Sequence, residues 1–302
     1  QAAHDAASDG QIIRISGVCG DLHQNNGPSQ LLAITKNITL QGGWNSTFTT
    51  LDATTFPTYL ESGALGRVLY INSNVSPVLE NLNLRNGNAT ALGGGPSGKD
   101  AGGAVYINGG TPLFKNVEIA NSLSPDLGGG VYLASPNVIN FQGGAIRGNT
   151  AGERGGGLYV DSSAPVLTGV NILSNNARGG GGVYLYRSPA QFIDNAPVGS
   201  VPTCRIDNNT SSVMPNYVAG PSGGGLPVLW LAPGGGGGIV FDESAAILRG
   251  CSINANTARV GGGAYVHNSA AFIENSLFTA NRALQPAPTA ILIGPGGVRD
   301  GD

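Results

Sequence analysis

The sequence predicts an all-β fold: a right-handed, single-stranded parallel β-helix, with about 25 residues and three short strands in each turn, or rung. Three observations predict it. A Gly-Gly-X-apolar-Tyr-apolar phrase recurs at a nearly constant interval, and two further short apolar stretches follow each copy. Gly, Pro and Asn separate these stretches, and no segment has the 3.6-residue period of a helix.

The repeated phrase marks the first strand of each rung. Its aromatic position advances by 25 to 27 residues from Tyr106 through Tyr132 and Tyr159 to Tyr184, then by 56 to Val240 and by 25 to Tyr265. The double-length step predicts an inserted loop at about residues 210–234. The copies are Gly102–Ile107, Gly128–Leu133, Gly155–Val160, Gly180–Leu185, Gly261–Val266 and the variant Gly236–Phe241.

The third stretch of the later rungs ends in asparagine. Asn tolerates the left-handed backbone that a sharp corner needs, and stacked amides can hydrogen-bond from rung to rung. We therefore interpret the recurrent residue as a structural ladder rather than a catalytic or sugar-bearing group. Its members are Asn149, Asn175, Asn209, Asn256 and Asn281.

The chain divides into irregular or capping rungs over 1–65 and a regular β-helix over 66–302, with about eight or nine rungs in all. Neither end shows an amphipathic capping helix, and residues 1–10 are polar. Open strand edges at the ends of a solenoid can join other edges, so self-association, head-to-tail or lateral, is expected.

The composition and charge of the chain argue against nucleic-acid binding and favour an extracellular location. Only 11% of the residues are charged, the net charge is −3, and no basic stripe occurs, so nucleic-acid binding is not expected. No apolar run is long enough to span a membrane. The start at Gln1, together with low Lys and high Asn, Thr, Ser and Gly, favours a processed, extracellular protein.

The cysteines show no metal-binding spacing, and no cofactor is expected. Alignment of the third strands places Val117, Ala145, Val170, Cys204, Cys251 and Ser276 in one core-facing column. If residues 210–234 leave the rod, Cys204 and Cys251 lie on adjacent rungs, ~4.8 Å apart, which a disulfide accepts. The alternative is a pair of buried thiols that pack as small apolar side chains.

Two candidate contact surfaces contain aromatic residues. If the apolar neighbours of each Tyr point inward, strand alternation directs the tyrosines outward as an exposed column, suited to protein contacts or sugar stacking. The alternative is that Tyr is simply a good strand residue on a solvent face. The column comprises Tyr106, Tyr132, Tyr159, Tyr184 and Tyr265, and the inserted loop contributes Tyr217 and Trp230.

No catalytic cluster emerges from the 25-residue period. Hydrolysis of a glycan needs paired carboxylates, but the acidic residues are scattered. Asp161 and Asp242 follow first strands two rungs apart, ~10 Å from each other. His267 follows a core strand and is interpreted as a turn residue. We therefore expect a protein that is not an enzyme.

Short motifs in the chain resemble the repeats of the polymorphic outer-membrane proteins of chlamydiae, which alternate Gly-Gly-Ala-[Ile/Val] with Phe-x-x-Asn. The resemblance covers roughly residues 30–285 and implies an exported, surface-displayed bacterial protein with an adhesive role. It does not extend to the long C-terminal β-barrel region of those proteins. The matching segments are 102–105, 143–146, 192–195, 272–275 and 278–281.

The sequence thus predicts a non-enzymatic extracellular structural or adhesive solenoid, which could assemble into a surface filament or sheath. Its expected partners are further copies of itself, other surface proteins or polysaccharide. A polysaccharide-binding module is the alternative, and a polysaccharide lyase or hydrolase is the third interpretation.

Overall fold

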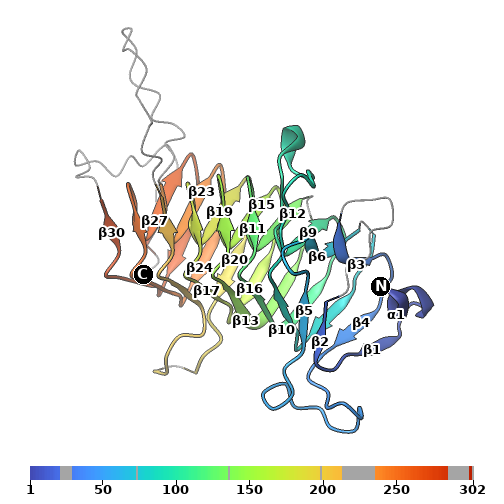
Figure 1. The fold of residues 1–302 in the computed structure, drawn as a ribbon. Helices are drawn as coiled ribbons and strands as arrows, with labels where there is room; N and C mark the ends of the chain where they lie inside the picture. The colour runs from blue at the N-terminus through green and yellow to red at the C-terminus, as the bar shows by residue number, and fades with distance from the viewer. Residues whose placement is uncertain are drawn as a thin grey trace.

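The chain forms one continuous coil of short parallel strands, seen in a computed structural model (Figure 1). The structure describes residues 1–20, 29–72, 74–134, 137–197, 199–212, 235–284 and 299–300. Three parallel sheets run along the coil, and each strand pairs in register with the equivalent strand of the next rung. The predicted parallel β-helix is confirmed.

The repeated Gly-Gly phrase supplies the last six strands of the eight-stranded sheet. Its strands stack with the aromatic positions directly opposite one another, so Tyr106 pairs with Tyr132 and Tyr132 with Tyr159. The strands are β3 (Gln30–Ile34), β6 (Arg67–Ile71), β9 (Val105–Asn108), β12 (Val131–Ala134), β15 (Leu158–Asp161), β19 (Val183–Tyr186), β23 (Ile239–Asp242) and β27 (Ala264–His267).

The second and third stretches of most rungs share a longer sheet, and a residue with a positive φ bends the chain between them, as at Asn81, Asn116 and Gly169. Its strands are β1 (Ile12–Arg14), β2 (Val18–Cys19), β4 (Thr39–Gln41), β5 (Tyr59–Glu61), β7 (Val78–Glu80), β8 (Asn83–Arg85), β10 (Leu113–Ala120), β13 (Asn140–Arg147), β16 (Val166–Thr168), β17 (Asn171–Leu173), β20 (Gln191–Ile193), β21 (Arg205–Asp207), β24 (Ile247–Arg249), β25 (Ser252–Asn254), β28 (Phe272–Glu274), β29 (Leu277–Thr279) and β31 (Arg299–Asp300).

A third, six-stranded sheet closes each rung with two-residue strands. They are β11 (Leu123–Ser124), β14 (Thr150–Ala151), β18 (Asn176–Ala177), β22 (Thr210–Ser211), β26 (Thr257–Ala258) and β30 (Arg282–Ala283). Thr210 and Ser211 therefore belong to a rung rather than to the insertion that the sequence placed at 210–234. The strands before residue 66 join the same sheets as the later ones.

The core is a stack of in-register columns because every rung repeats the same inward positions. One column runs through Leu79, Phe114, Phe141, Leu167, Phe192 and Leu248, and another through Leu84, Ile119, Ile146, Ile172, Ile206 and Ile253. All of these side chains are at most 3% exposed. Burial of each of these aliphatic or aromatic side chains stabilises the folded state by about 1.5–3 kcal/mol.

The asparagine ladder is present, but its backbone differs from the expectation. Asn149 Nδ2 donates to Asn175 Oδ1, and the same bond repeats from Asn175 to Asn209 at 3.0 Å and onward to Asn256 and Asn281. The left-handed residue is the one before each ladder Asn, such as Ser174 (φ 55°) or Ala255 (φ 53°). The residue before each ladder Asn therefore adopts the left-handed conformation of the corner, and the ladder amide forms hydrogen bonds along the axis of the rod.

One register assignment was wrong. Val117 pairs with Gly144, not with Ala145, which pairs with Glu118 and faces outward. Gly144 has a φ of +84°, and the Val117 backbone fills the space that a side chain would need. Glycine rather than alanine therefore occupies this place in the core-facing column.

A short helix covers the N-terminal end of the eight-stranded sheet, where the sequence indicated no cap. Helix α1 (Ala2–Ala6) has no visible helical period because it is only five residues long. Gln1 Oε1 accepts a hydrogen bond from the backbone N–H of Ala33, and His4 Nε2 accepts one from Thr35. Lys36 Nζ donates to the carbonyls of His4, Asp5 and Ala7. Residues 1–10 are thus docked on strand β3.

Candidate functional site

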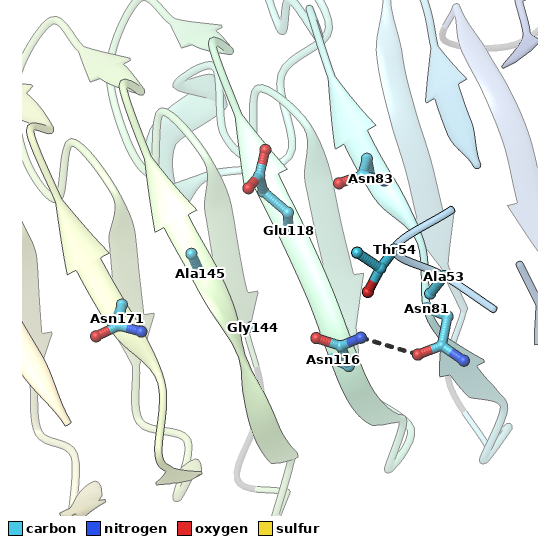
Figure 2. Close-up of a pocket in the computed structure, with 9 residues that line it drawn as sticks. All are labelled: Ala53, Thr54, Asn81, Asn83, Asn116, Glu118, Gly144, Ala145 and Asn171. Carbon is cyan, nitrogen blue, oxygen red and sulfur yellow. Dashed lines mark hydrogen bonds between the residues drawn. The ribbon is translucent and has the colours of Figure 1, made fainter. Parts of the chain in front are cut away.

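A groove crosses the outer face of the long sheet where its two halves bend toward one another (Figure 2). It has a volume of about 450 Å³. The segment between β4 and β5 forms one wall through Ala53 and Thr54. The remaining lining comes from β8, β10, β13 and β17 and from the turn before β8: Asn81, Asn83, Asn116, Glu118, Gly144, Ala145 and Asn171.

The groove residues share an outward orientation that strand alternation dictates. Asn83, Glu118, Ala145 and Asn171 occupy one register column, and the inward residues beside them belong to the core. Ala145 and Gly144 give the column a low floor between Glu118 and Asn171, as Figure 2 shows. The result is a shallow trough that runs across successive rungs.

Amide groups dominate the chemistry of the groove. Asn116 Nδ2 donates to Asn81 Oδ1 at 2.9 Å, and Asn83 Nδ2 donates to the carbonyl of Thr58 at 2.9 Å. Within the described part of the chain, the buried Oδ1 atom of Asn171 has no hydrogen-bond partner. Because this oxygen is buried, it is not exposed to a ligand in the groove.

The one carboxylate that lines the groove is engaged. Glu118 Oε1 accepts from Arg147 at 2.6 Å, and this hydrogen bond raises the pKa of the Arg147 guanidinium. Hydrolysis of a glycosidic bond by the usual route needs two carboxyl groups about 5–9.5 Å apart. The groove lining offers a single ion-paired carboxylate and four neutral amides.

The prediction that the tyrosine column is exposed is wrong. The rings point away from the main core, as alternation predicts, but Tyr106, Tyr132, Tyr159 and Tyr184 are only 2–6% exposed and Tyr265 is half-buried. The segment before each Gly-Gly pair covers the rings. Ala101 and Leu127 belong to this segment and pack with the tyrosines in a second buried apolar cluster, separate from the main core. These tyrosines form an internal layer. Tyr217 and Trp230 lie outside the described residues.

No regular sequence signal marks this covering segment. The position five residues before each column member is Ala101, Leu127, Arg154, Gly179, Gly235 or Val260. Parallel bridges link the first four of these in succession and link Gly235 to Val260. Side chains of such different polarity show no pattern that predicts burial of the tyrosines. The guanidinium of Arg154 itself lies 5.0 Å from the centre of the Tyr184 ring.

Cys204 and Cys251 meet in the core at the base of the insertion. Their sulfur atoms are 2.11 Å apart and their Cα atoms 4.8 Å apart, and the two residues are 47 positions apart in the sequence. Strands β21 and β25, which follow the two cysteines, pair in register. The disulfide geometry thus arises from rung stacking, as the sequence reasoning proposed.

The sequence did not predict a polar cluster that lies at the carboxyl ends of four strands of the eight-stranded sheet. Asp161, Tyr186, Asp242 and His267 occupy successive places in one column, so Tyr186 separates the two aspartates. Asp242 accepts hydrogen bonds from Tyr184 and His267. His267 therefore belongs to a strand and a buried network rather than to a turn. Its separation of 25 residues from Asp242 was the available signal.

Other site classes find little support in the described ranges. No group of three or more His, Cys, Asp or Glu side chains there could hold a metal ion. Across the same residues, no helix has the length and apolar character needed to cross a membrane.

The parallel sheets, the stacked columns and the surface groove define a parallel β-solenoid. The family model described as the right-handed beta helix region matches residues 67–293, and the chain belongs to this family. No curated protein and no solved structure matches the chain. The family relationship therefore establishes the fold and its handedness.

Proposed function

We propose that this chain is a non-enzymatic, surface-exposed β-solenoid that binds a neutral polysaccharide in the groove over the long sheet. The observation that carries the proposal is the groove lining: four asparagines and a low Gly144–Ala145 floor. Amides can donate to and accept from sugar hydroxyls at once. A trough across rungs also suits a linear polymer.

Two further observations support the setting of this function. The Cys204–Cys251 disulfide is typical of proteins from oxidising compartments. The sequence resemblance to chlamydial surface repeats favours an adhesive role at a cell surface. The tyrosine column does not contribute to this proposal because its rings are buried.

The test is to obstruct the groove at its floor. Ala145→Arg places a long side chain between Glu118 and Asn171, whereas Ser252→Arg adds the same side chain to the same outward column beyond the groove lining. We expect a polysaccharide identified on a glycan array to lose affinity for Ala145→Arg and to keep it for Ser252→Arg. Equal losses in both variants, or no bound glycan, would contradict the proposal.

The non-enzymatic part has its own measurement. Incubation of the protein with the bound polysaccharide should release neither reducing ends nor unsaturated sugars. Release of either product that disappears in Glu118→Gln would overturn this part of the proposal and leave the binding site itself intact.

Self-association is the second candidate function, and exposed apolar side chains on the two N-terminal strands of the long sheet favour it. Ile12 in β1 and Val18 in β2 are 57% and 63% exposed. Helix α1 covers strand β3 of the neighbouring sheet, which leaves the long sheet as the route for contact between copies. Light scattering over a concentration series should detect oligomers that Ile12→Asp and Val18→Asp together abolish. A monomer at all concentrations would remove this candidate.

A further inference from the structure

Five tyrosine rings form a continuous stack beside the eight-stranded sheet. Tyr70, Tyr106, Tyr132, Tyr159 and Tyr184 have successive ring centroids 5.4–5.5 Å apart and interplanar angles of 5–12°. The stack ends at Tyr184 because Val240 occupies the next register position. The spacing follows from strand register, so the stack alone indicates only packing.

The hydroxyl group at the end of the stack donates to a carboxylate that a histidine also contacts. Tyr184 Oη donates to Asp242 Oδ2 at 2.6 Å, and His267 Nδ1 lies 2.7 Å from Asp242 Oδ1. Tyr184 and Asp242 are 5% and 4% exposed. A carboxylate accepts hydrogen bonds, so Nδ1 is assigned as the protonated nitrogen of His267. The three side chains form a buried polar network in which His267 holds the carboxylate in place.

The other stacked phenols have different partners. Tyr106 donates to the backbone carbonyl of Gly94, which cannot accept a proton, and Tyr159 is hydrogen-bonded to the cationic Arg154. Tyr132 is hydrogen-bonded to Asp161, whose register neighbours are Ala134 and Tyr186. Within the described stack, only Tyr184 combines a carboxylate acceptor with a histidine that fixes that acceptor.

This arrangement matches the needs of a phenol that is oxidised by one electron. A phenol that loses an electron becomes a strong acid, and a charged radical buried away from water is costly. A carboxylate at hydrogen-bond distance can take the proton in the same step. Burial raises the pKa of Tyr184, so the phenol stays protonated until oxidation occurs. Arg154, 5.0 Å from the ring centre, also opposes a cationic radical and so favours the neutral one.

We propose that Tyr184 is a redox-active tyrosine, which gives one electron to a radical-class or metal-complex one-electron oxidant and its phenolic proton to Asp242. The O–H bond of Tyr184 breaks, Asp242 Oδ2 gains the proton, and the oxidant is reduced by one electron. The electron leaves through the stacked rings, which bring Tyr184 into aromatic contact with Tyr159 and through it with the rest of the stack. The neutral radical returns to the phenol when an electron and the proton on Asp242 come back.

The experiment uses photogenerated tris(bipyridine)ruthenium(III) as the oxidant of the full chain. Transient absorption follows formation of the tyrosyl radical, and electron paramagnetic resonance of frozen samples follows its survival. We expect a long-lived radical that Tyr184→Phe removes and Tyr106→Phe retains. Both variants keep the ring and delete one hydroxyl, so they are matched. Asp242→Asn keeps the shape without the base and should slow radical formation by about 100-fold or more.

Several results would overturn the proposal. They are a long-lived radical unchanged in Tyr184→Phe, an equal loss in Tyr106→Phe, or formation at the wild-type rate in Asp242→Asn. Tyr159→Leu interrupts the stack and should slow oxidation of Tyr184; an unchanged rate would refute passage through the rings. If a variant does not fold, the wild-type protein still decides. Its radical must couple magnetically to one exchangeable proton, and absence of that coupling refutes proton transfer to Asp242.

Discussion

Asn175 offers the sharpest test of how the rungs are held together. Its side-chain Oδ1 accepts from the N–H of Asn149 at 2.9 Å and from Asn149 Nδ2 at 3.1 Å, and its Nδ2 donates to the carbonyl of Ile146 at 2.9 Å. Asn175→Ala removes these bonds. The N–H of Asn149 loses its acceptor and the carbonyl of Ile146 loses this donor, whereas Asn149 Nδ2 keeps its hydrogen bond to the carbonyl of Ile119. At about 1–3 kcal/mol for each of the two affected backbone groups, the free energy of unfolding should fall by about 2–6 kcal/mol.

Chemical denaturation monitored by circular dichroism measures this loss. The control is Asn254→Ala, whose amide lies outside the ladder and accepts a surface hydrogen bond from Thr279. We expect that control to lose no more than about 0.5 kcal/mol, the range of surface substitutions. If Asn175→Ala falls in the same range, the ladder contributes little, and our account of the corner is refuted.

Asn175→Asp adds a pH dependence to the same position. A carboxylate there would face the carbonyl of Ile146 and the side-chain oxygen of Asn209, so its folded-state pKa is raised above the unfolded value of about 3.9. The variant should therefore be most stable below about pH 3.9, relative to wild type, and lose stability as pH rises through the raised pKa. A constant difference from wild type between acid and neutral pH would contradict this reasoning.

Three further predictions concern separate parts of the rod. Tyr132→Ala should lower the free energy of unfolding by about 3–5 kcal/mol, as for other buried aromatic residues, whereas Tyr132→Phe keeps the stacked ring and should lose less in the same denaturation assay. Thiol titration of the denatured chain should find two fewer thiols before reduction than after it, and Cys204→Ala with Cys251→Ala should cost about 2–5 kcal/mol; equal thiol counts would exclude the disulfide. At Asp194, burial raises the pKa, but hydrogen bonds from Thr203 and the Cys204 N–H outweigh it and lower the pKa overall. Stability from this group is thus present above pH ~3.9 and lost as pH falls through the lowered pKa. Asp194→Ala should remove that acid-side loss and speed protease cleavage of 195–203; an unchanged pH profile would count against it.

The repeated rungs could be predicted from the sequence because a period is a global signal. Each copy of the Gly-Gly phrase marks the same strand, and the register between copies aligns Cys204 with Cys251. The ladder asparagines followed from the same alignment. The rung to which a residue belongs could therefore be predicted wherever the 25-residue period holds.

Features that depend on chain outside the strands could not be predicted in this way. The tyrosines are buried by a preceding segment with no consistent polarity, and helix α1 is too short to show a helical pattern. The groove could not be predicted because Asn81 and Asn116 are bend residues that lie 35 positions apart in the sequence, and only the stacking of the rungs brings their side chains together.

The ladder also bears on how the protein can be modified. Asn209 and Asn256 are 47 residues apart, yet Asn209 Nδ2 donates to Asn256 Oδ1 at 3.0 Å, the same distance as between Asn175 and Asn209, which are 34 residues apart. The rungs on either side of the insertion therefore stack as the other rungs do, although a longer stretch of chain separates them. Closing a longer excursion adds only about 0.6 kcal/mol for each doubling of length. The junction is thus a graft point, where a foreign epitope or a whole domain can be carried on the side of the rod while its periodic frame continues unchanged.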